Sequence, residues 1–471
     1  MIRKILFVLM LVFGLLTRFY KINAPLADWH SWRQADTSSV ARNFVKSGYN
    51  LFLPKFDDLS SIPSGKENPN GYRLVEFPIY NFFHALLFQS FQSLKIFSFE
   101  ATGRLVTIIA SLLSAVFLYL IVKRVIDEKT AFLATFFFLF LPYNIFYSRV
   151  ILPEPTMVAF ALGSVFFALE SKFLISSLFA AISILVKPYA IFIIIPSLAV
   201  IFTEKFFKEK EKPIVIIKAI LYGLLIALPT FLWRLRIKQF PEGIPANNWL
   251  FNANGIRFRP AWWRWLFGER LANLILGKWG TVLFSLGLVG KTKKDILFYS
   301  WLAGIFMFWA IFATGNVQHD YYQIIAIPVI SFFLAKGANF LLTPNKNFYS
   351  GFRFSLLAFS LLMLFGLSWY QVKEYYKINH PEIVEAGAAA DKILPENAKV
   401  VAPYNGDTAF LYQTNRQGWP IGDTIEKMTE RGANYFISVN FDNLTNEVIS
   451  RCQLVEKGEK WLIASLENCH E

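Results

Sequence analysis

The sequence predicts an all-α polytopic membrane protein with a small α/β domain at its C-terminal end. Of the 471 residues, 55% are hydrophobic and 17% are charged, whereas soluble domains carry about 25% charged residues. A water-soluble core cannot bury this much apolar surface, so lipid must cover part of it. The composition therefore excludes soluble, disordered and fibrous proteins, and it changes sharply only after about residue 373.

Eleven apolar runs approach the length that a helix needs to cross a bilayer. They lie at about 5–22, 104–122, 131–147, 155–169, 173–187, 189–203, 214–234, 279–290, 296–314, 322–342 and 354–372. A further apolar stretch, 77–94, is interrupted by polar residues such as Asn81 and Gln89. Arg18 follows the first run without a small-residue cleavage site, so we interpret this run as an uncleaved span.

The net charge of +14 indicates a membrane orientation rather than a nucleic-acid surface. The basic residues gather in short clusters beside the apolar runs: Arg3-Lys4, Lys123-Arg124, Lys205–Lys212, Lys291–Lys294, and Lys346 with Arg353. Such clusters are typical of cytoplasmic segments. We place the N-terminus inside because of Arg3 and Lys4. The later clusters then all face the cytoplasm if 77–94 does not cross, and they all face outward if it crosses. We therefore expect about eleven crossings of the plasma or inner membrane, with a cytoplasmic N-terminus and with 77–94 at the outer interface.

This topology places the chemically interesting segments on one face. The outer pieces are the loop 23–76, the turn 148–155, the loop 235–278, two shorter turns near 187–188 and 315–321, and the C-terminal region. We accordingly predict a transmembrane domain at 1–372 and a soluble extracytoplasmic α/β domain at 373–471, within the usual domain size.

The C-terminal region carries the signals of alternating strands and helices. Residues 398–404 and 433–439 predict strands, 425–432 predict a helix that ends in glycine, and the residues around Gly458 predict a hairpin. Cys452 and Cys469 would lie in an oxidising compartment. We expect a disulfide that closes a loop of about 16 residues and contributes roughly 3 kcal/mol, with two free thiols as the alternative.

The first outer loop offers two candidate acids. On a helix, Trp29, Trp32, Arg33 and Asp36 share one face, so Arg33 becomes the neighbour of Asp36. The structural reading is an interfacial helix with a solvated Arg–Asp pair. The functional reading is a general base at the membrane surface.

The second acid ends the same loop. Glu76 follows Arg73 and shares a helical face with Tyr80. It is either an acid favoured by a helix N-terminus or a group that positions substrate.

A charged residue between apolar spans costs free energy, and this cost favours a functional role for such a residue. Arg149 and Glu154 flank a short turn, and Lys187 is the one charge between Phe173 and Thr203. Each also has a simpler interpretation, namely mutual pairing or snorkelling to the interface. His319, Tyr321 and Tyr322 open a late span and are candidates to contact a phosphate or a metal.

The loop 235–278 interleaves Arg257 and Arg259 with tryptophans. This pattern is typical of a membrane-surface helix, with phosphate or sugar contacts as the second interpretation.

Two classes of function fit acids and cations on one outer face. An enzyme acting on a lipid phosphate is the first, and a transporter or flippase for a lipid-linked or anionic substrate is the second. Transporters usually place ionisable groups near the bilayer midplane, on broken helices of repeated halves. Here the spans are uncharged between their ends and no repeat is evident, which favours the enzyme.

The order of motifs resembles the GT-C membrane glycosyltransferases. W-R-x-x-D ends at Asp36, E-F-P begins at Glu76, S-R-x-x-x-P-E ends at Glu154, L-x-K-P contains Lys187, and H-x-Y-Y ends at Tyr322. The chain looks most like bacterial relatives of protein O-mannosyltransferases and of the lipid A aminoarabinose transferase, over residues 1–372. The resemblance implies a polyprenyl-phosphate sugar donor and a glycan, lipid or protein acceptor. It also implies catalytic roles for Asp36, Glu76 and Glu154.

The resemblance implies a mechanism with one general base. Asp36 takes the proton of an acceptor hydroxyl and the configuration inverts. By position, Lys187 and the segment His319–Tyr322 match regions near the donor phosphate. We expect the substrate to be bound by Arg33, Arg73, Tyr80, Arg149, Lys187, Arg257, Arg259, His319, Tyr321 and Tyr322. Some relatives use a divalent cation, for which Glu76 and His319 are the candidate ligands. The chain departs from the pattern at Phe77, where some relatives have lysine. All of these side chains are expected to gather at one extracytoplasmic opening.

Overall fold

The computed structural model describes residues 2–208, 212–344 and 349–470 and divides into two compact units. Unit 1 comprises Met1–Tyr20, Thr107–Arg234 and Asn247–Tyr375, and unit 2 comprises Lys21–Val106, Leu235–Ala246 and Tyr376–Glu471. Lys346 and part of the basic cluster Lys205–Lys212 lie outside the described residues. The C-terminal region therefore shares a unit with the first outer loop, across the boundary that we drew at residue 372.

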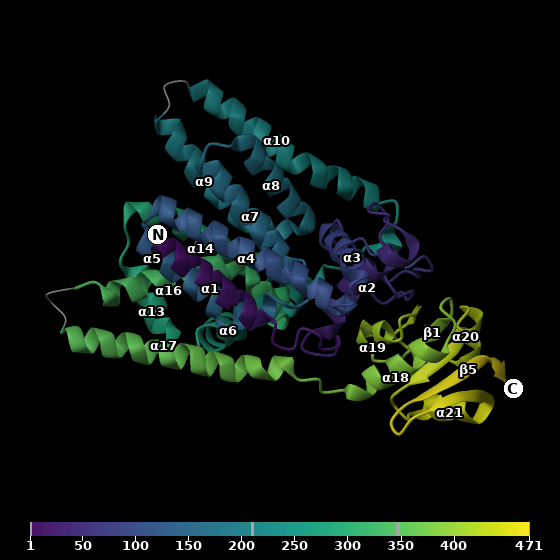
Figure 1. Cartoon of the computed structure of the whole chain (residues 1–471). Helices are drawn as coiled ribbons and strands as arrows, with labels where there is room; N and C mark the ends of the chain where they lie inside the picture. The colour runs from purple at the N-terminus through teal and green to yellow at the C-terminus, as the bar shows by residue number, and fades with distance from the viewer. Residues whose placement is uncertain (1, 209–211, 345–348, 471) are drawn as a thin grey trace. The chain divides into compact units, whose positions relative to one another are not determined.

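Unit 1 consists of helices (Figure 1). Its longer helices are α1 (Ile2–Arg18), α4 (Phe99–Val125), α5 (Glu128–Phe140), α7 (Glu154–Leu169), α8 (Phe173–Val186), α9 (Ile191–Lys208), α10 (Lys212–Ile237), α13 (Gly280–Val289), α14 (Ile296–Ile311), α16 (Ile327–Leu342) and α17 (Ser350–Val372). The first turns of α4 and the last residues of α10 belong to unit 2. Shorter helical pieces are α6 (Pro142–Tyr147), η1 (Pro188–Ala190), α11 (Trp249–Asn252), η3 (Ala253–Phe258), α12 (Pro260–Trp263), the π-helix η4 (Arg264–Ile275), η5 (Lys293–Asp295), α15 (Ala313–Gln318), η6 (Asp320–Ala326) and η7 (Lys373–Tyr376).

Every predicted span coincides with one or two of these helices, and the chain is a polytopic membrane protein. Among the described residues, five helices are long and apolar enough to cross a membrane, or six if a bent pair counts as one span. The bent pair joins Pro260–Ile275 to Gly280–Val289 at 113°. Other predicted spans are shorter, such as α7 with 16 residues and α8 with 14. The count of eleven crossings stays a prediction.

Small residues allow the helices of unit 1 to approach closely. α7 lies beside α8 and α9, α9 lies beside α14, and α13 lies beside α16. Gly287 on α13 and Gly337 on α16 face each other's backbones, and a Cβ at either position would overlap a carbonyl of the other helix. Membrane helices pack through such small residues because lipid supplies no hydrophobic driving force between them.

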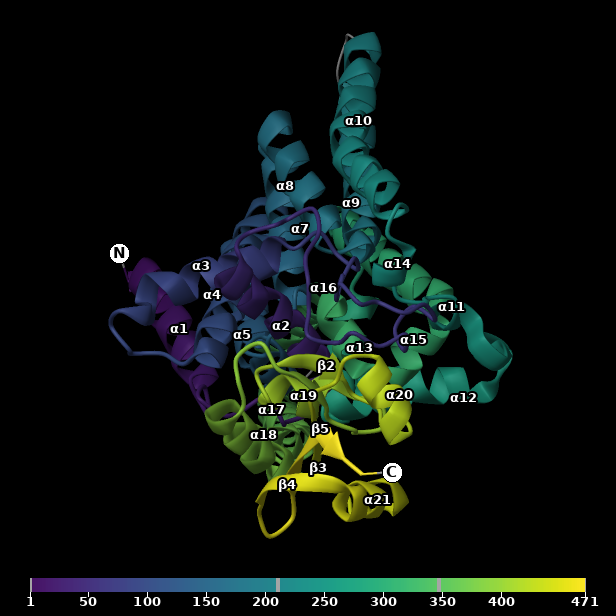
Figure 2. The ribbon, with the colours of Figure 1, turned by 90° about the vertical axis from the view of Figure 1, so that its right-hand side faces the viewer.

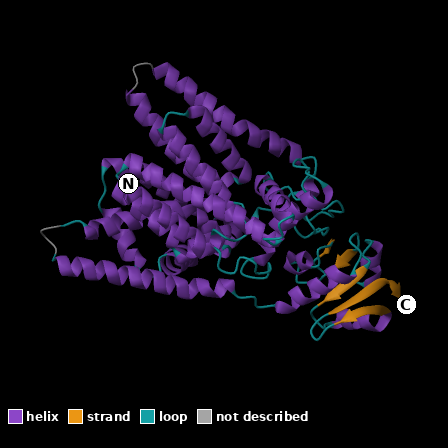
Figure 3. Ribbon diagram, viewed as in Figure 1, coloured by secondary structure: helices purple, strands orange, loops and turns teal. Residues whose placement is uncertain are grey.

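Unit 2 combines two loop helices with an α/β layer. The loop helices are α2 (Ser31–Ser47) and α3 (Ile79–Gln92), and η2 (Pro241–Gly243) lies in its central segment. The C-terminal region contains α18 (Pro381–Ile393), α19 (Thr408–Gln413), α20 (Ile425–Glu430), α21 (Asn443–Arg451), β1 (Lys399–Val401), β2 (Gln417–Trp419), β3 (Tyr435–Ser438), β4 (Cys452–Lys457) and β5 (Leu462–Cys469). Figure 3 shows that all strands lie in this region.

The five strands form one mixed sheet in the order β2-β1-β3-β5-β4 (Figure 2). β1 is parallel to β2 and β3, whereas β5 is antiparallel to β3 and β4. The first loop covers the edge strand β2, because Leu59 N donates to Gly418 O at 2.8 Å and Gly418 N donates to Asp57 O at 2.9 Å. An edge that is paired in this way cannot recruit another chain.

Two polar anchors hold α3 against the start of α4 within unit 2. The hydroxyl of Tyr80 donates to Gly103 O at 2.8 Å, and His84 Nε2 lies 2.8 Å from Phe99 O. Burial lowers the pKa of His84 to about 4, so its imidazole is neutral at physiological pH. The interfacial position expected for 77–94 stays a prediction.

The predicted features of the C-terminal region are confirmed. β1, β3, α20 and the β4–β5 hairpin all fall inside the predicted segments. Gly432 adopts a φ of +87°, which suits the end of α20 because glycine accepts this conformation without strain. Cys452 and Cys469 form the expected disulfide.

Removal of this disulfide should loosen the hairpin that it closes. In the double variant Cys452→Ser/Cys469→Ser, we expect β4 and β5 to lose roughly 3 kcal/mol of local stability, because the open chain has more conformational entropy. Hydrogen–deuterium exchange of the full-length protein measures this as faster exchange in β4 and β5, with α13 and α16 unchanged. Reductant should speed exchange in the wild type alone, and unchanged exchange in β4 and β5 of the variant would contradict the expectation.

Candidate functional site

Asp36 is a buried carboxylate in the middle of α2. It is 5% exposed, and each of its oxygens accepts one hydrogen bond. Arg73 Nη2 donates to Oδ2 at 2.6 Å, and Thr408 Oγ1 donates to Oδ1 at 2.7 Å. Thr408 comes from α19 of the C-terminal region, so two segments far apart in sequence hold this carboxylate. The reading of Asp36 as a solvated surface group is wrong.

The cation beside Asp36 is Arg73 and not Arg33. Arg33 instead forms an ion pair with Glu76, and both side chains are largely buried. Arg33 and Asp36 lie one turn apart on α2, whereas Arg73 and Glu76 lie at the end of the loop, so the two pairs join the same two segments. We call Arg33, Asp36, Arg73 and Glu76 the α2 quartet. Opposite charges alternate in it, which offsets the cost of removing four charges from water.

Two further carboxylates lie near the α2 quartet. Burial, together with the negative charge of Asp36, raises the pKa of Asp58 to about 6. Burial likewise raises the pKa of Asp407 to about 6, again with a contribution from Asp36. Asp407 also caps α19, because its side chain accepts a hydrogen bond from Ala409 N at 2.7 Å. The surroundings of Asp36 therefore include two acids that titrate near neutral pH.

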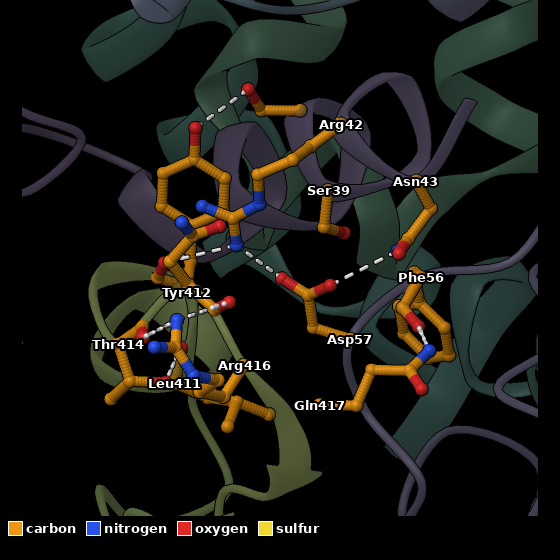
Figure 4. Close-up of polar contacts among 12 residues, drawn as sticks. Ser39, Arg42, Asn43, Phe56, Asp57, Leu411, Tyr412, Thr414, Arg416 and Gln417 are labelled. Carbon is orange, nitrogen blue, oxygen red and sulfur yellow. Dashed lines mark hydrogen bonds and ion pairs between the residues drawn. The ribbon is translucent and has the colours of Figure 1, made fainter. Parts of the chain in front are cut away.

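Tyr412 links the C-terminal region to α2 and to the start of α4, all within unit 2. Its hydroxyl lies 3.0 Å from Ser38 Oγ and donates to Glu100 Oε1 at 2.9 Å. The guanidinium of Arg42 lies 4.1 Å from the centre of the Tyr412 ring and donates to its backbone carbonyl at 3.0 Å (Figure 4). Arg42 also pairs with Asp57. Burial raises the pKa of Tyr412 well above its usual value, so the phenol remains a donor.

Unit 1 contains a second buried ion pair. Glu154 begins α7, Lys187 ends α8, and the ammonium of Lys187 donates to Glu154 Oε1. The two residues are 2% and 6% exposed. Lys187 Nζ also lies 5.5 Å from the ring centres of Tyr189 and Tyr322 and 5.9 Å from that of Tyr321. Aromatic faces at this distance attract a cation.

The segment 319–322 joins these aromatic contacts. His319 stacks on Tyr321 with ring centres 5.3 Å apart and lies 5.8 Å from Tyr322. Sequence analysis missed Asp320, which is 1% exposed. Asp320 accepts hydrogen bonds from the hydroxyls of Tyr147 and Tyr375, the latter at 2.6 Å. Asp320 stands between His319 and Tyr321, which the sequence analysis had selected as site residues, and this position was the signal that could have found it.

The three remaining predicted cations of unit 1 have different surroundings. Arg149 is fully buried, with its guanidinium 5.8 Å from the Phe146 ring centre. Arg257 donates to Ile311 O at 3.1 Å and so helps to hold η3. Arg259 is exposed and precedes α12. The predicted surface helix at 235–278 is instead a series of short helical pieces and the π-helix η4.

Metal binding at the predicted ligands Glu76 and His319 stays a prediction. Glu76 Oε1 accepts a hydrogen bond from the guanidinium of Arg33. Within residues 2–208, 212–344 and 349–470, no group of three or more His, Cys, Asp or Glu side chains is placed to hold a metal ion. We derive no catalytic step through a metal.

The predicted site residues thus form two groups. Unit 2 holds the α2 quartet and Tyr80, and unit 1 holds Glu154, Lys187, Tyr321, Tyr322, His319 and the three arginines Arg149, Arg257 and Arg259. The expectation that both groups serve one opening stays a prediction.

The fold defines the class: this is a membrane protein with the GT-C fold. The family described as dolichyl-phosphate-mannose-protein mannosyltransferase matches residues 78–233, about a third of the 471-residue chain. The matched segment includes Arg149, Glu154 and Lys187, and it begins after Asp36 and Glu76. No curated protein matches the chain in sequence.

Solved structures resemble the whole chain. ArnT from Cupriavidus metallidurans in the apo state superposes with a TM-score of 0.66 at 12% identity and covers 100% of both chains. The same protein bound to undecaprenyl phosphate gives a TM-score of 0.65 at 11% identity and covers 98% of this chain and 97% of that one.

A more distant likeness is to AglB, the archaeal oligosaccharyltransferase from Archaeoglobus fulgidus, in complex with an inhibitory peptide and a dolichol-phosphate. It gives a TM-score of 0.54 at 11% identity and covers 92% of this chain and 69% of that one. These likenesses show the fold.

The raised pKa of Asp58 predicts a pH-dependent gain in stability for Asp58→Asn. The folded state binds the proton more tightly than the unfolded state, so ionisation destabilises the wild type as pH rises from about 4 to 6. Asparagine keeps the oxygen that accepts from Ser60 N and cannot ionise. The variant should exceed the wild type by up to ~3 kcal/mol at pH 8 and match it at pH 4.

Thermal unfolding in detergent, measured from pH 4 to 8, tests this expectation. Asp423 serves as a control of opposite sign, because the N–H of Thr424 lowers its pKa. Asp423→Asn should therefore not exceed the wild type in stability at pH 8, because the ionised carboxylate of the wild type is favoured in the folded state. An Asp58→Asn variant that is less stable than the wild type at pH 8 would contradict the burial argument.

Proposed function

We propose that the protein is an integral-membrane glycosyltransferase. It moves a sugar from a polyprenyl-phosphate donor to an acceptor hydroxyl on the outer face of the membrane, with inversion of configuration. The GT-C fold and the undecaprenyl phosphate and dolichol-phosphate in the names of the matched structures support a lipid-phosphate donor. The observation that carries the proposal is a buried carboxylate, Asp36, on the first loop of that fold.

Asp36 has the properties that a general base needs. Each of its oxygens accepts one hydrogen bond from the described residues, and a carboxylate offers about two lone pairs on each oxygen. One lone pair therefore suits the proton of an acceptor hydroxyl. Arg73 and Thr408 fix the orientation of the carboxylate, which matters because proton transfer depends on geometry first.

The reaction then follows from the charges. Asp36 takes the proton, the acceptor oxygen bonds to the anomeric carbon, and the bond from that carbon to the phosphate oxygen breaks. The leaving polyprenyl phosphate carries the developing negative charge. Lys187 and Arg149 are the buried cations of unit 1 that we assign to this phosphate, with Arg257 or Arg259 at its periphery.

The proposed sugar is a hexose or pentose, and the proposed acceptor is a glycan, lipid or protein. A divalent cation stays a secondary proposal, because one AglB structure is a complex with Zn and sulfate. The membrane orientation follows the charge clusters, with the N-terminus in the cytoplasm and the C-terminal region outside.

The transporter alternative receives less support from the buried charges. Glu154 begins a helix and Lys187 ends one, so these ionisable groups lie at helix ends rather than at mid-helix. Reconstituted vesicles distinguish the two classes. A transferase releases polyprenyl phosphate from a lipid-linked sugar, whereas a flippase moves the intact lipid across the bilayer.

Substitution of the base should abolish transfer without unfolding the protein. Asp36→Asn keeps the size of the side chain and one acceptor oxygen, but it removes the base, which contributes about 10²–10⁴-fold. We expect mass spectrometry of envelope glycans and lipids to show at least about a 100-fold loss of product. Asp391→Asn, in α18 of the same unit and likewise paired with an arginine, is the matched control. Wild-type product levels from Asp36→Asn would remove Asp36 from this role.

Substitution of the phosphate cation should weaken donor binding. Lys187→Met leaves Glu154 as an unpaired buried charge, so the double variant Lys187→Met/Glu154→Gln separates structure from binding. A hydrogen bond to a charged group is worth about 1.5–3 kcal/mol, so KM for the lipid-linked donor should rise about 10- to 100-fold in both variants. Recovery of wild-type KM in the double variant would show that Lys187 has only a structural role.

A further inference from the structure

A cavity opens at the end of unit 1 where α4 and α7 finish and α14 begins. Its volume is about 530 Å³, within the roughly 300–1,000 Å³ of small-molecule sites. Three cations line it, Arg124, Lys293 and Lys294, and Glu204 is the one acid among the lining residues. These lining residues carry a net charge of +2 at neutral pH (three cations minus one acid). Arg124 Nε also donates to Glu170 Oε1 at 3.2 Å, so the lining cations that pair with no described acid are Lys293 and Lys294.

The turn that carries the two lysines is held in place by a buried carboxylate. Asp295 is 1% exposed and accepts hydrogen bonds from Thr292 N at 2.7 Å and from Lys336 Nζ at 2.5 Å. Thr292 and Asp295 together form a capping box around η5. Within the part of the chain that the structure describes, Lys336 neutralises Asp295, and Lys293 and Lys294 form no ion pair. The backbone of this turn is thus held in place, and the exposed side chains of Lys293 and Lys294 leave their charge available to a ligand.

The rest of the lining is apolar, which makes the cavity amphiphilic. Val200 and Ile201 on α9 and Leu297 on α14 contribute to it. The segment Lys293–Ile311 is one of the candidate membrane spans, and so is Phe99–Val125, which ends beside Arg124. The cations therefore lie at the ends of spans, where lipid headgroups are, and the apolar side chains lie toward the hydrocarbon.

This cavity is distinct from the candidate functional site. Glu154 begins α7 and Leu169, which lines the cavity, ends it. The 16 residues of that helix measure about 24 Å at 1.5 Å per residue. Lys187 likewise ends α8, while Ser171 of the cavity precedes that helix. The cavity and the Glu154–Lys187 pair thus lie at opposite ends of the same helices.

We propose that this cavity binds the phosphate group of an anionic membrane glycerophospholipid. The phosphate lies against Lys293, Lys294 and Arg124, and the first part of an acyl chain lies against Val200, Ile201 and Leu297. Basic pockets between membrane helices bind anionic headgroups in this way. The lipid joins α4, α9 and α14 at one end of unit 1. This binding does not depend on the proposed transferase activity.

Binding is measured on the full-length protein in neutral detergent. Phosphatidylglycerol, phosphatidylcholine and inorganic phosphate are added separately, and the midpoint of thermal unfolding is recorded. We expect phosphatidylglycerol alone to raise the midpoint, by at least about 2 °C at saturation. In Lys293→Gln/Lys294→Gln, the apparent affinity for phosphatidylglycerol should fall about 30-fold, since each lysine near an anionic lipid is worth about 1 kcal/mol.

The matched control removes two lysines from the same end of the helices but not from the cavity. Lys129→Gln/Lys172→Gln changes the first turn of α5 and the residue before α8, both exposed, and should bind like the wild type. Equal losses in the two double variants, or equal stabilisation by phosphatidylcholine, would overturn the proposal. If inorganic phosphate raised the midpoint as much as phosphatidylglycerol, the ligand would be free phosphate and the proposed lipid binding would be overturned.

Two measurements keep the test decisive if the double variant fails to fold. The single variants Lys293→Gln and Lys294→Gln each should lose about five-fold in apparent affinity. Phosphatidylglycerol should also slow amide exchange of residues 291–297 in the wild type, relative to phosphatidylcholine. Unchanged exchange in this segment would contradict binding in the cavity.

Discussion

The cost of burying charge is the constraint on which both units depend. An ion loses several kcal/mol when it leaves water unless a partner and hydrogen bonds replace the lost hydration. Within the described residues, Asp36, Glu76, Glu154 and Asp295 each have a cation partner. In every case the partner lies on another segment of the chain, so the pair also fixes where those segments meet. A carboxylate or an ammonium that is held in this way has little freedom to reorient, which is what a reactive group requires.

The helices could be predicted from the sequence because apolar length is a local property. Each predicted span coincides with helix, and the strands around Val401 and Ile437 fall where alternation placed them. Ion-pair partners are not local. Helical spacing correctly placed Arg33 one turn from Asp36, yet the side chains turn to Glu76 and Arg73, which approach from the end of the loop. Spacing along one helix says nothing about which other segment supplies the better partner.

Two site residues had signals too weak to detect. Thr408 lies in a region that the sequence analysis described as a soluble domain, and a threonine that begins a short helix is usually a structural residue. Asp320 was passed over beside His319, although its carboxylate accepts from two tyrosine hydroxyls. Each residue contacts a segment that is distant in sequence. Thr408 contacts α2, and Asp320 contacts α6 and η7. Only tertiary structure reveals such contacts.

The contacts of Tyr412 constrain how the C-terminal region can change during evolution. The C-terminal region supplies Thr408 to Asp36 and buries Tyr412 against Ser38, Arg42 and Glu100. A chain that ended before this region would lack Tyr412, which contacts the guanidinium of Arg42 and donates a hydrogen bond to Glu100. Exchange of the tail between relatives would therefore require matching changes on α2. The C-terminal region and the first loop should therefore coevolve, so that substitutions in one are accompanied by substitutions in the other.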